Sequence, residues 1–445
     1  MTIRKRIPHL SLAVATATVA LGVSVPLHAQ VAILAEHDDP SDFDLNSTRT
    51  GYFANDRNVS VKNHPHPGYD TIPFRFGSLL VTPSLQASLE YNDNLLASSA
   101  VSEKAAVLSL VPTVFLKSDW SRNYLQAYAN ADIDRYTGHS AENRNQWQLG
   151  TRGRFDIDQA TSIQAGGSAE RKVELRTAAT APATDRPISY NDEAVFLGAT
   201  KAFNRLRVIG YGNFDNKTYN DATQNGIAID QKFRNRETLS FNGQAEYALL
   251  PGYSLLVTAQ VDHRNSTHGT VINPQRDSNG IDIQAGASFD IGGLATGSLT
   301  AGYIRRKYDN PFYGNVSDPT FAANIEYYAT PLITVRLAAG RTVEDSTVGG
   351  AGGFLATTVA AHADYEFQRN VIFTAGGGLG FDNFKGIDRR DDRRNADASV
   401  RWLLNRALEV GVRYNLENQA SSGLQPGRRF TVNRIGVSLT YRGNQ

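Results

Sequence analysis

Charged and amide side chains recur at every second position along much of this 445-residue chain. In the segment 145–157 the polar parity is Gln146, Gln148, Arg152, Arg154 and Asp156. The other parity is apolar and holds Trp147, Leu149, Phe155 and Ile157. Carboxylates, amides and guanidinium groups on one surface can hydrogen-bond hydroxyl-rich solutes such as sugars.

Polar positions of this kind indicate the lining of a lumen, because successive strand side chains point to opposite faces. Isolated charges in a dry interior are prohibitive, so such a lumen must be wet or fully paired. The expected lining residues are Asp132, Asp134, Arg152, Arg154, Glu170, Lys172, Glu246, Asp262, Asp282, Asp290, Glu326, Arg336, Asp397, Arg401, Glu409, Arg413 and Arg434. Glu193 and Lys201 are assigned to the same lining. Both signs occur, so no strong preference for anions or cations is expected.

Catalytic and metal-binding motifs are not expected in this chain. There is no cysteine and no H-E-x-x-H pattern. His64 and His66 could bind a metal as a pair, but a solvated turn is the favoured interpretation. The glycine-rich stretch 375–380 lies within a strand pattern and lacks a following helix, so it does not predict a phosphate loop. We therefore expect neither an enzyme nor a cofactor.

The elements that carry these residues are about eighteen segments of alternating polarity between Leu79 and Arg442. Segments of about 10 to 13 residues that alternate in this way are typical of transmembrane strands. The mean hydropathy of -0.36 is too polar for a helical membrane protein. The fold class predicted is all-β: a transmembrane antiparallel up-and-down β-barrel of about 18 strands.

The connections between the segments alternate in length, which predicts a topology. Short turns are expected near 118–122, 158–160, 203–205, 250–253, 292–295, 330–331, 368–370 and 405–406. Longer loops are expected between them, for example at 92–104 and 174–190. Outer-membrane barrels have short periplasmic turns and long extracellular loops. This rhythm predicts nine outward hairpins, with both ends of the barrel in the periplasm.

The N-terminal region predicts export from the cytoplasm. Residues 1–29 resemble a secretory signal, with basic Arg4, Lys5 and Arg6, an apolar run, and cleavage near Ala29. Residues 30–76 are polar and rich in turns, and we expect a periplasmic extended arm that could also tuck into the barrel mouth. The barrel is then expected over 77–445. The net charge of +1 gives no indication of nucleic-acid binding.

A barrel of this size predicts a channel, because sixteen to eighteen strands leave an aqueous lumen unless it is plugged. The first alternative is a non-conducting outer-membrane scaffold whose arm docks a periplasmic export partner. The second is a secreted soluble β-protein. Partners expected from the barrel itself are outer-membrane lipid and the barrel-assembly machinery, since the strand 435–442 ends the chain with an alternating, aromatic pattern.

A family resemblance lies at the start of the barrel. The segment 66–79 contains Pro67-Gly68-Tyr69-Asp70 and leads into Pro83-Ser84-Leu85, then Tyr91-Asn92-Asp93-Asn94. This order resembles a family of bacterial β-barrel porins linked to exopolysaccharide biosynthesis and export. The resemblance implies an outer-membrane location in a Gram-negative cell. It also implies a role in passing polysaccharide, with periplasmic polysaccharide-export proteins and the polysaccharide as partners.

Overall fold

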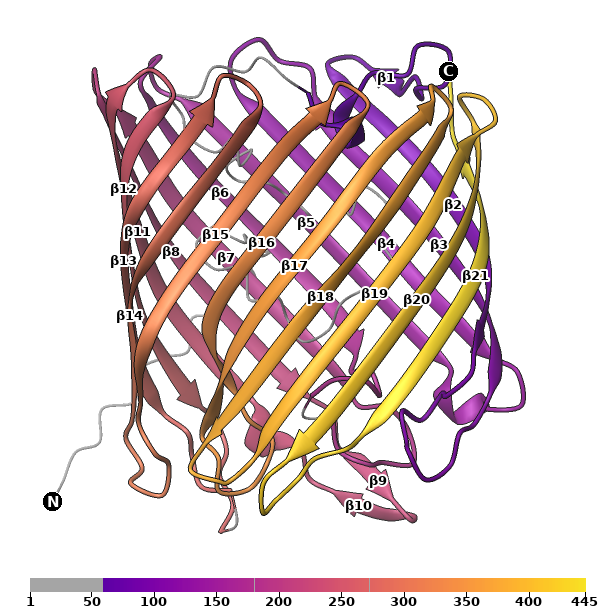
Figure 1. Ribbon diagram of the computed structural model, residues 1–445, viewed down its shortest axis with the longest axis vertical. Helices are drawn as coiled ribbons and strands as arrows, with labels where there is room; N and C mark the ends of the chain where they lie inside the picture. Colours follow the sequence, from indigo (N-terminus) through magenta and orange to yellow (C-terminus); the bar gives the residue numbers. More distant parts are fainter. Residues whose placement is uncertain (1–58, 180, 272) are drawn as a thin grey trace, which may run out of the picture.

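Long antiparallel strands wind into one ring (Figure 1). The computed structural model describes residues 59–445, except residues 180 and 272. The strands of the ring are β2 (Leu79–Asn92), β3 (Ala105–Ser118), β4 (Tyr124–Tyr136), β5 (Arg144–Asp156), β6 (Thr161–Val173), β7 (Ser189–Ala202), β8 (Leu206–Tyr219), β11 (Arg236–Leu250), β12 (Tyr253–Ser266), β13 (Ser278–Ile291), β14 (Ala295–Tyr308), β15 (Val316–Thr330), β16 (Ile333–Asp345), β17 (Gly353–Gln368), β18 (Val371–Lys385), β19 (Arg390–Leu403), β20 (Leu408–Ser422) and β21 (Phe430–Arg442). They are 13 to 16 residues long, more than the 10 to 13 predicted, because they continue past the membrane core at their ends.

The ring is closed, because β2 pairs with both β3 and β21. The sheet has 19 strands, of which β1 (Phe74–Phe76) is a short addition to the start of β2, so 18 strands form the ring. A separate hairpin, β9 (Ala222–Gln224) and β10 (Ile227–Ile229), lies in the connection from β8 to β11. The predicted fold class, an antiparallel up-and-down barrel of about 18 strands, is confirmed.

The outer surface of the ring is apolar because alternate residues of its strands are large hydrophobic side chains. Leu197 is 62% exposed and Phe241 is 56% exposed, which suits contact with lipid. Phe203, Tyr247 and Trp402 are exposed beside short turns, where an interfacial girdle of aromatic residues is expected. This surface is the physical reason to place the barrel in a membrane.

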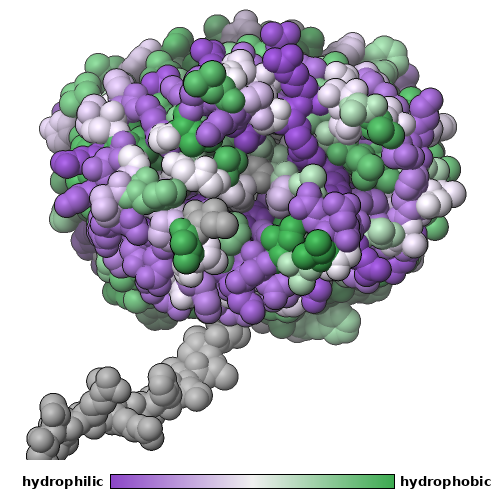
Figure 2. All heavy atoms as spheres, turned by 90° about the horizontal axis from the view of Figure 1, so that it is seen from below, coloured by the Kyte–Doolittle hydropathy of each residue, from purple (hydrophilic) through white to green (hydrophobic). Residues whose placement is uncertain are grey.

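Short and long connections lie at opposite ends of the barrel, as the length rhythm predicted. The short-turn end holds the connections 203–205, 251–252 and 292–294 among others, and the C-terminus also lies there (Figure 1). The long-loop end holds the connections 93–104, 174–188 and 220–235 among others. Figure 2 looks onto the long-loop end, where hydrophilic side chains dominate.

The seam between the first and last strands is reinforced at the short-turn end. The turn between β1 and β2 contains Gly77, whose φ of 61° is accessible to glycine at little cost. The backbone N–H of Ile72 donates to Asn444 Oδ1 at 2.8 Å, and that of Gln445 donates to the Ile72 carbonyl at 3.2 Å. The segment that precedes β1 is therefore hydrogen-bonded to the C-terminal residues.

Helical structure among residues 59–445 is limited to three single-turn 3-10 helices: η1 (Val61–Asn63), η2 (Ser140–Glu142) and η3 (Lys232–Arg234). In this described part of the chain, no helix is long and apolar enough to cross a membrane. The predicted signal 1–29 and most of the predicted arm, up to residue 58, lie outside the described residues.

Candidate channel lining

The expected lining residues share the inner parity of their strands. In β5, Trp147 and Leu149 are 41% and 44% exposed on the outer face, and Arg152 and Arg154 occupy the opposite parity. Cross-strand pairing carries this parity around the ring, where Glu246 lies opposite Leu256 and Arg207. The expected lining residues from Asp132 to Arg434 follow this inner parity, with the exception of Glu193 and Lys201.

Glu193 and Lys201 were assigned to the lumen wrongly. The buried face of β7 carries Tyr190, Asp192 and Phe196, whereas Glu193 and Lys201 are exposed on the other face. The error has a physical reason: the middle of β7 is apolar on both parities, so alternation does not decide which face is inner. Lys201 reaches the short-turn rim, where its Nζ lies 3.6 Å from Asp158 Oδ2.

Most inner-wall charges are paired between or along strands, and the pairs are spread around the wall. These ion pairs include Lys172–Glu170 at 2.9 Å, Arg154–Asp156 at 3.0 Å, Arg306–Asp262 at 2.7 Å, Arg336–Asp364 at 2.8 Å, His362–Asp397 at 3.3 Å, Arg413–Glu90 at 4.0 Å, Arg434–Glu417 at 2.8 Å and Arg442–Glu409 at 2.8 Å. Hydrogen bonds hold others, as from Ser109 and Gln146 to Asp132, Ser288 to Glu246, Gln284 to Asp282, Gly293 N–H to Asp290, and Tyr328 to Glu326. Asp134 is buried, 2% exposed.

Near the short-turn end, the inner wall has an acidic sector and a basic sector. The acidic sector covers β11 to β17 and holds Glu246, Asp290, Glu326, Asp364 and Glu366, with Arg336 among them. The basic sector covers the other strands and holds Lys117, Arg152, Arg154, Arg207, Arg401 and Arg442, with Asp156 and Glu409 among them. Facing sectors of opposite sign orient polar and charged solutes that pass between them.

Residues 59–70, which we name the docked segment, lie against this acidic sector. Val61 is fully buried, and its backbone N–H donates to Thr334 Oγ1 at 3.0 Å. His64 Nδ1 lies 2.6 Å from Glu366 Oε2, and His66 Nε2 lies 3.9 Å from the same oxygen. Sequence reasoning missed Thr334 and Glu366 as partners, since they are separated from the segment by about 300 residues and no local pattern links them.

Residues 174–188, which we name the mouth loop, are held by buried ion pairs at the long-loop end. Arg176 Nη2 lies 2.6 Å from Glu142 Oε1, next to β5. Arg234 in η3 lies 2.7 Å from Glu174 Oε1. Burial by itself would lower the pKa of Arg234, but Glu174 and Tyr219 together outweigh burial and raise it above its usual value. Arg234 is therefore firmly charged, and both arginines are paired.

The mouth loop also contacts loops from the far side of the ring. Arg389, between β18 and β19, donates from Nη2 to the Ala179 carbonyl at 3.0 Å. Arg428, between β20 and β21, donates to the carbonyl of Arg176. In the order of the ring, β18 and β19 lie nearly opposite β6 and β7, and β20 and β21 lie about a third of the way round, so the mouth loop reaches across the opening. Burial, and next to it the nearby Arg176 charge, lower the pKa of Arg428.

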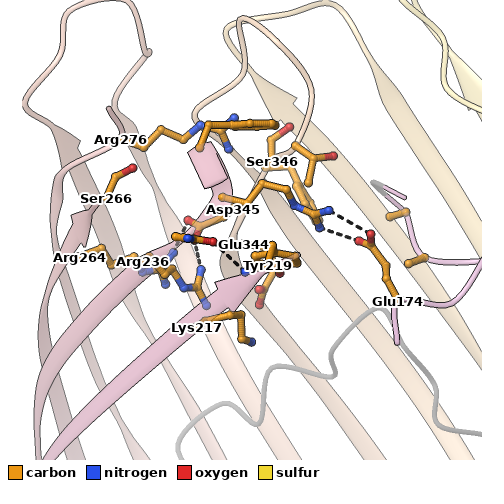
Figure 3. A pocket seen from close by; sticks show the side chains of 17 residues that line it. Glu174, Lys217, Tyr219, Arg236, Arg264, Ser266, Arg276, Glu344, Asp345 and Ser346 are labelled. Atoms are coloured by element: carbon orange, nitrogen blue, oxygen red, sulfur yellow. Dashed lines mark hydrogen bonds and ion pairs between the residues drawn. The ribbon is translucent and has the colours of Figure 1, made fainter. Parts of the chain in front are cut away.

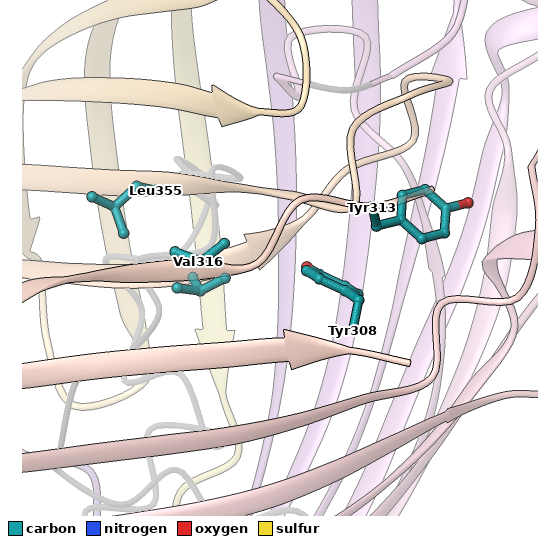
Figure 4. Close-up of a cluster of buried hydrophobic side chains, with 5 residues drawn as sticks. Tyr308, Tyr313, Val316 and Leu355 are labelled. Atoms are coloured by element: carbon teal, nitrogen blue, oxygen red, sulfur yellow. The ribbon is translucent and has the colours of Figure 1, made fainter. Parts of the chain in front are cut away.

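A hairpin formed by the ends of β16 and β17 leans inward beside the mouth loop. Asp345, at the end of β16, contacts Arg236 on β11 and lies 2.5 Å from Arg264 on β12 (Figure 3). A hydrophobic cluster holds the base of this hairpin against β14 and β15; it contains Tyr308, Tyr313, Val316, Val343 and Leu355 (Figure 4). Between hairpin and wall lies a cavity of about 150 Å³.

In the described chain, histidines and carboxylates do not cluster as a metal site requires. Among the residues outside 1–58, 180 and 272, no group of three or more such side chains is placed to hold a metal ion. His64 and His66 instead contact the single carboxylate of Glu366.

A closed ring of strands with an apolar outside and a charged inside defines an outer-membrane β-barrel of the porin class. The chain matches the family described as "Putative beta-barrel porin 2" over residues 66–443, and it belongs to that family. Its location is accordingly the outer membrane. Curated proteins offer no match to the chain.

Several solved barrels are similar in overall shape. OccK2 (OpdF) of Pseudomonas aeruginosa has 11% identity and a TM-score of 0.45, covering 81% of this chain and 98% of that one. The outer membrane protein opdK of the same organism has 12% identity and a TM-score of 0.41, covering 82% and 99%. The siderophore receptor PirA of Acinetobacter baumannii has 8% identity and a TM-score of 0.45, covering 82% and 80%.

Proposed function

We propose that this barrel is a channel for small hydrophilic solutes. The observation that carries the proposal is the inner wall, where polar and charged side chains alternate around a closed ring of 18 strands. A ring of that size leaves space for water along its axis unless a segment fills it. The short-turn end faces the periplasm in this proposal, because short turns are periplasmic in outer-membrane barrels.

The substrates proposed are hydroxyl-rich solutes, namely sugars and exported polysaccharide. Carboxylates, amides and guanidinium groups occur side by side on the inner wall, as in the contacts of Asp132 with Ser109 and Gln146. Such groups can each donate to or accept from sugar hydroxyls. The resemblance between Tyr69 and Asn94 to porins linked to exopolysaccharide supports the same substrate class, with periplasmic export proteins as partners.

The mouth loop would restrict the size of these solutes at the outer opening. It reaches across the ring and is fixed at Glu142, Arg234, Arg389 and Arg428. A fixed loop sets a size limit without closing the channel, provided that water-filled space remains beside it. A polymer would need this loop to move.

Uptake of sugars by proteoliposomes tests the proposal. Liposomes that contain the refolded protein should swell at rates that fall with solute size from a monosaccharide to a tetrasaccharide. Liposomes with protein denatured before reconstitution are the control. Equal rates with folded and denatured protein, at every solute size, would contradict a channel.

A second candidate function is a non-conducting scaffold that docks a periplasmic export partner. It is favoured by one observation: the docked segment occupies the short-turn opening through Val61 and His64. A scaffold predicts no swelling even after the docked segment is deleted. A channel narrowed by that segment predicts faster swelling after the deletion.

A further inference from the structure

The cavity between the β16–β17 hairpin and the wall is rich in positive charge. It is about 150 Å³ in volume and is lined by Lys217 on β8, Arg234 in η3, Arg236 on β11, Arg264 on β12 and Arg276 in the β12–β13 loop (Figure 3). A cavity of this size accommodates a six-membered ring. These cations differ in whether a carboxylate already pairs with them.

Lys217 and Arg234 each have a carboxylate of their own. Lys217 Nζ lies 2.7 Å from Asp192 Oδ2, and Arg234 Nη2 lies 2.7 Å from Glu174 Oε1. Pairs of this kind are already satisfied, so they have little to offer an incoming anion.

Arg236 and Arg264 share carboxylates with each other and with Arg306, which does not line the cavity. Arg236 and Arg264 both contact Asp345, and Arg264 also lies 3.3 Å from Asp262. Asp262 also pairs with Arg306, whose Nη2 lies 2.7 Å from Asp262 Oδ1. Glu344 lies beside these groups in the cavity wall. Each of these three guanidinium groups therefore already has a carboxylate partner.

Arg276 is the remaining cation. Its Nε donates to the Tyr313 hydroxyl at 3.3 Å, and its guanidinium lies 5.5 Å from the centres of both the Phe233 and Tyr313 rings. The Nη2 atom is buried without a hydrogen-bond partner, and the described residues supply no carboxylate to it. The two aromatic rings and the Tyr313 hydroxyl hold the guanidinium in place.

We propose that Arg276 binds the carboxylate of an acidic sugar in this cavity. Arg276 lines the cavity without a carboxylate partner among the described residues, and a guanidinium donates charge-assisted hydrogen bonds to a carboxylate. The inference rests on the proposed channel and names its substrate class: a hydrophilic solute with one carboxylate per sugar unit, held at the long-loop mouth.

Calorimetric titration of the folded protein in detergent with glucuronate tests the site, with glucose as the neutral match. Glucuronate should bind and glucose should not, and added salt should weaken the binding. Arg276→Gln should weaken glucuronate binding by about tenfold or more, since it removes a charge-assisted bond. Arg276→Lys, which keeps the charge but loses the planar fork, should fall between the two.

Lys232→Gln is the matched control, since this exposed lysine in η3, within the β8–β11 connection, pairs with Asp221 and does not line the cavity. It should bind glucuronate like the wild type. Heat-dependent gel migration shows that each variant is folded. Equal affinity for glucuronate and glucose, no binding of glucuronate, or unchanged binding by folded Arg276→Gln would each overturn the inference. Calorimetry does not depend on conduction. A barrel that conducts ions but does not bind glucuronate refutes only the Arg276 site. A barrel that binds glucuronate but does not conduct ions refutes only the channel.

Discussion

The Arg176 guanidinium and the Glu142 carboxylate form a two-point ion pair inside the long-loop mouth. Nη2 lies 2.6 Å from Oε1, and Nε donates to Oε2 at 3.2 Å. The exposed fractions of the two side chains are 7% and 4%. Loss of one partner of such a pair leaves an uncompensated buried charge, so the pair fixes the mouth loop to the loop before β5.

Arg176→Gln should release the mouth loop and raise the single-channel conductance. The change leaves the Glu142 charge buried and unpaired, which costs about 3–5 kcal/mol in comparable buried pairs. Arg390→Gln is the control, since Arg390 and Asp392 form an exposed pair at 3.1 Å, worth about 1 kcal/mol or less. Equal conductance of Arg176→Gln, Arg390→Gln and wild type would show that the mouth loop does not restrict the pore.

A disulfide tests the position of the docked segment, because the native chain has no cysteine. The variant Val61→Cys with Thr334→Cys should cross-link under mild oxidation, since the Val61 N–H and Thr334 Oγ1 are 3.0 Å apart. Val61→Cys with Ser162→Cys, on the inner parity of β6, is the control pair. Cross-linking of both pairs at the same rate would mean that the segment is not docked on β16.

The contact between the mouth loop and the β9–β10 hairpin should depend on acid. Asp185 accepts hydrogen bonds from the backbone N–H groups of Gly226 at 2.9 Å and Asn225 at 2.8 Å, which lower the pKa of its carboxyl. Asn225 and Gly226 have φ values of 53° and 75°, as a tight hairpin turn requires. Because the pKa of Asp185 is lower in the folded than in the unfolded chain, this carboxylate stabilises the contact at pH values above its ordinary pKa of about 3.9. The contribution is lost as the pH falls through the folded pKa.

Hydrogen exchange of the Asn225 and Gly226 amides measures this contact. After correction for the intrinsic rate, protection should be present at pH 7 and should disappear below the folded pKa of Asp185. In Asp185→Asn, the protection of the two amides should be weaker at pH 7 and should not change with acid. Acid-dependent protection of equal size in both proteins would assign the effect to another group.

One glycine of β13 is packed so closely in the barrel wall that replacing it should destabilise the folded protein. A Cβ on Gly286 would lie 1.8 Å from the Leu299 carbonyl oxygen on β14, so Gly286→Ala should cost about 1–3 kcal/mol of unfolding free energy. Gly243→Ala on β11 is the control, since no atom lies within 4 Å of its added Cβ; it should change stability by about 0.5 kcal/mol or less. Denaturant midpoints of the two variants that agree within error would contradict this account of the wall.

Local alternation was enough to predict the strands, because residues that face lipid are apolar and their neighbours that face the lumen are polar. The length rhythm of the connections then predicted the two ends. Alternation failed at Glu193 and Lys201, because β7 is apolar on both faces and supplies no contrast between them.

Contacts between distant segments were outside the reach of the sequence. His64 and Glu366 are 302 residues apart, and Arg428 and Arg176 are 252 residues apart, yet each pair meets at a mouth of the barrel. Closure of the ring brings such residues together, and no short pattern marks them. Arg276 was missed for the same reason: its lack of a carboxylate is visible only when the surrounding loops are in place.

Single-channel recording in planar lipid bilayers tests the central claim most directly. The wild-type protein, refolded and inserted, should carry a steady ionic current, and Arg176→Gln should carry a larger one. No current from the folded wild type, from Arg176→Gln, or from a variant that lacks the docked segment would contradict the channel and leave the scaffold as the account of this barrel.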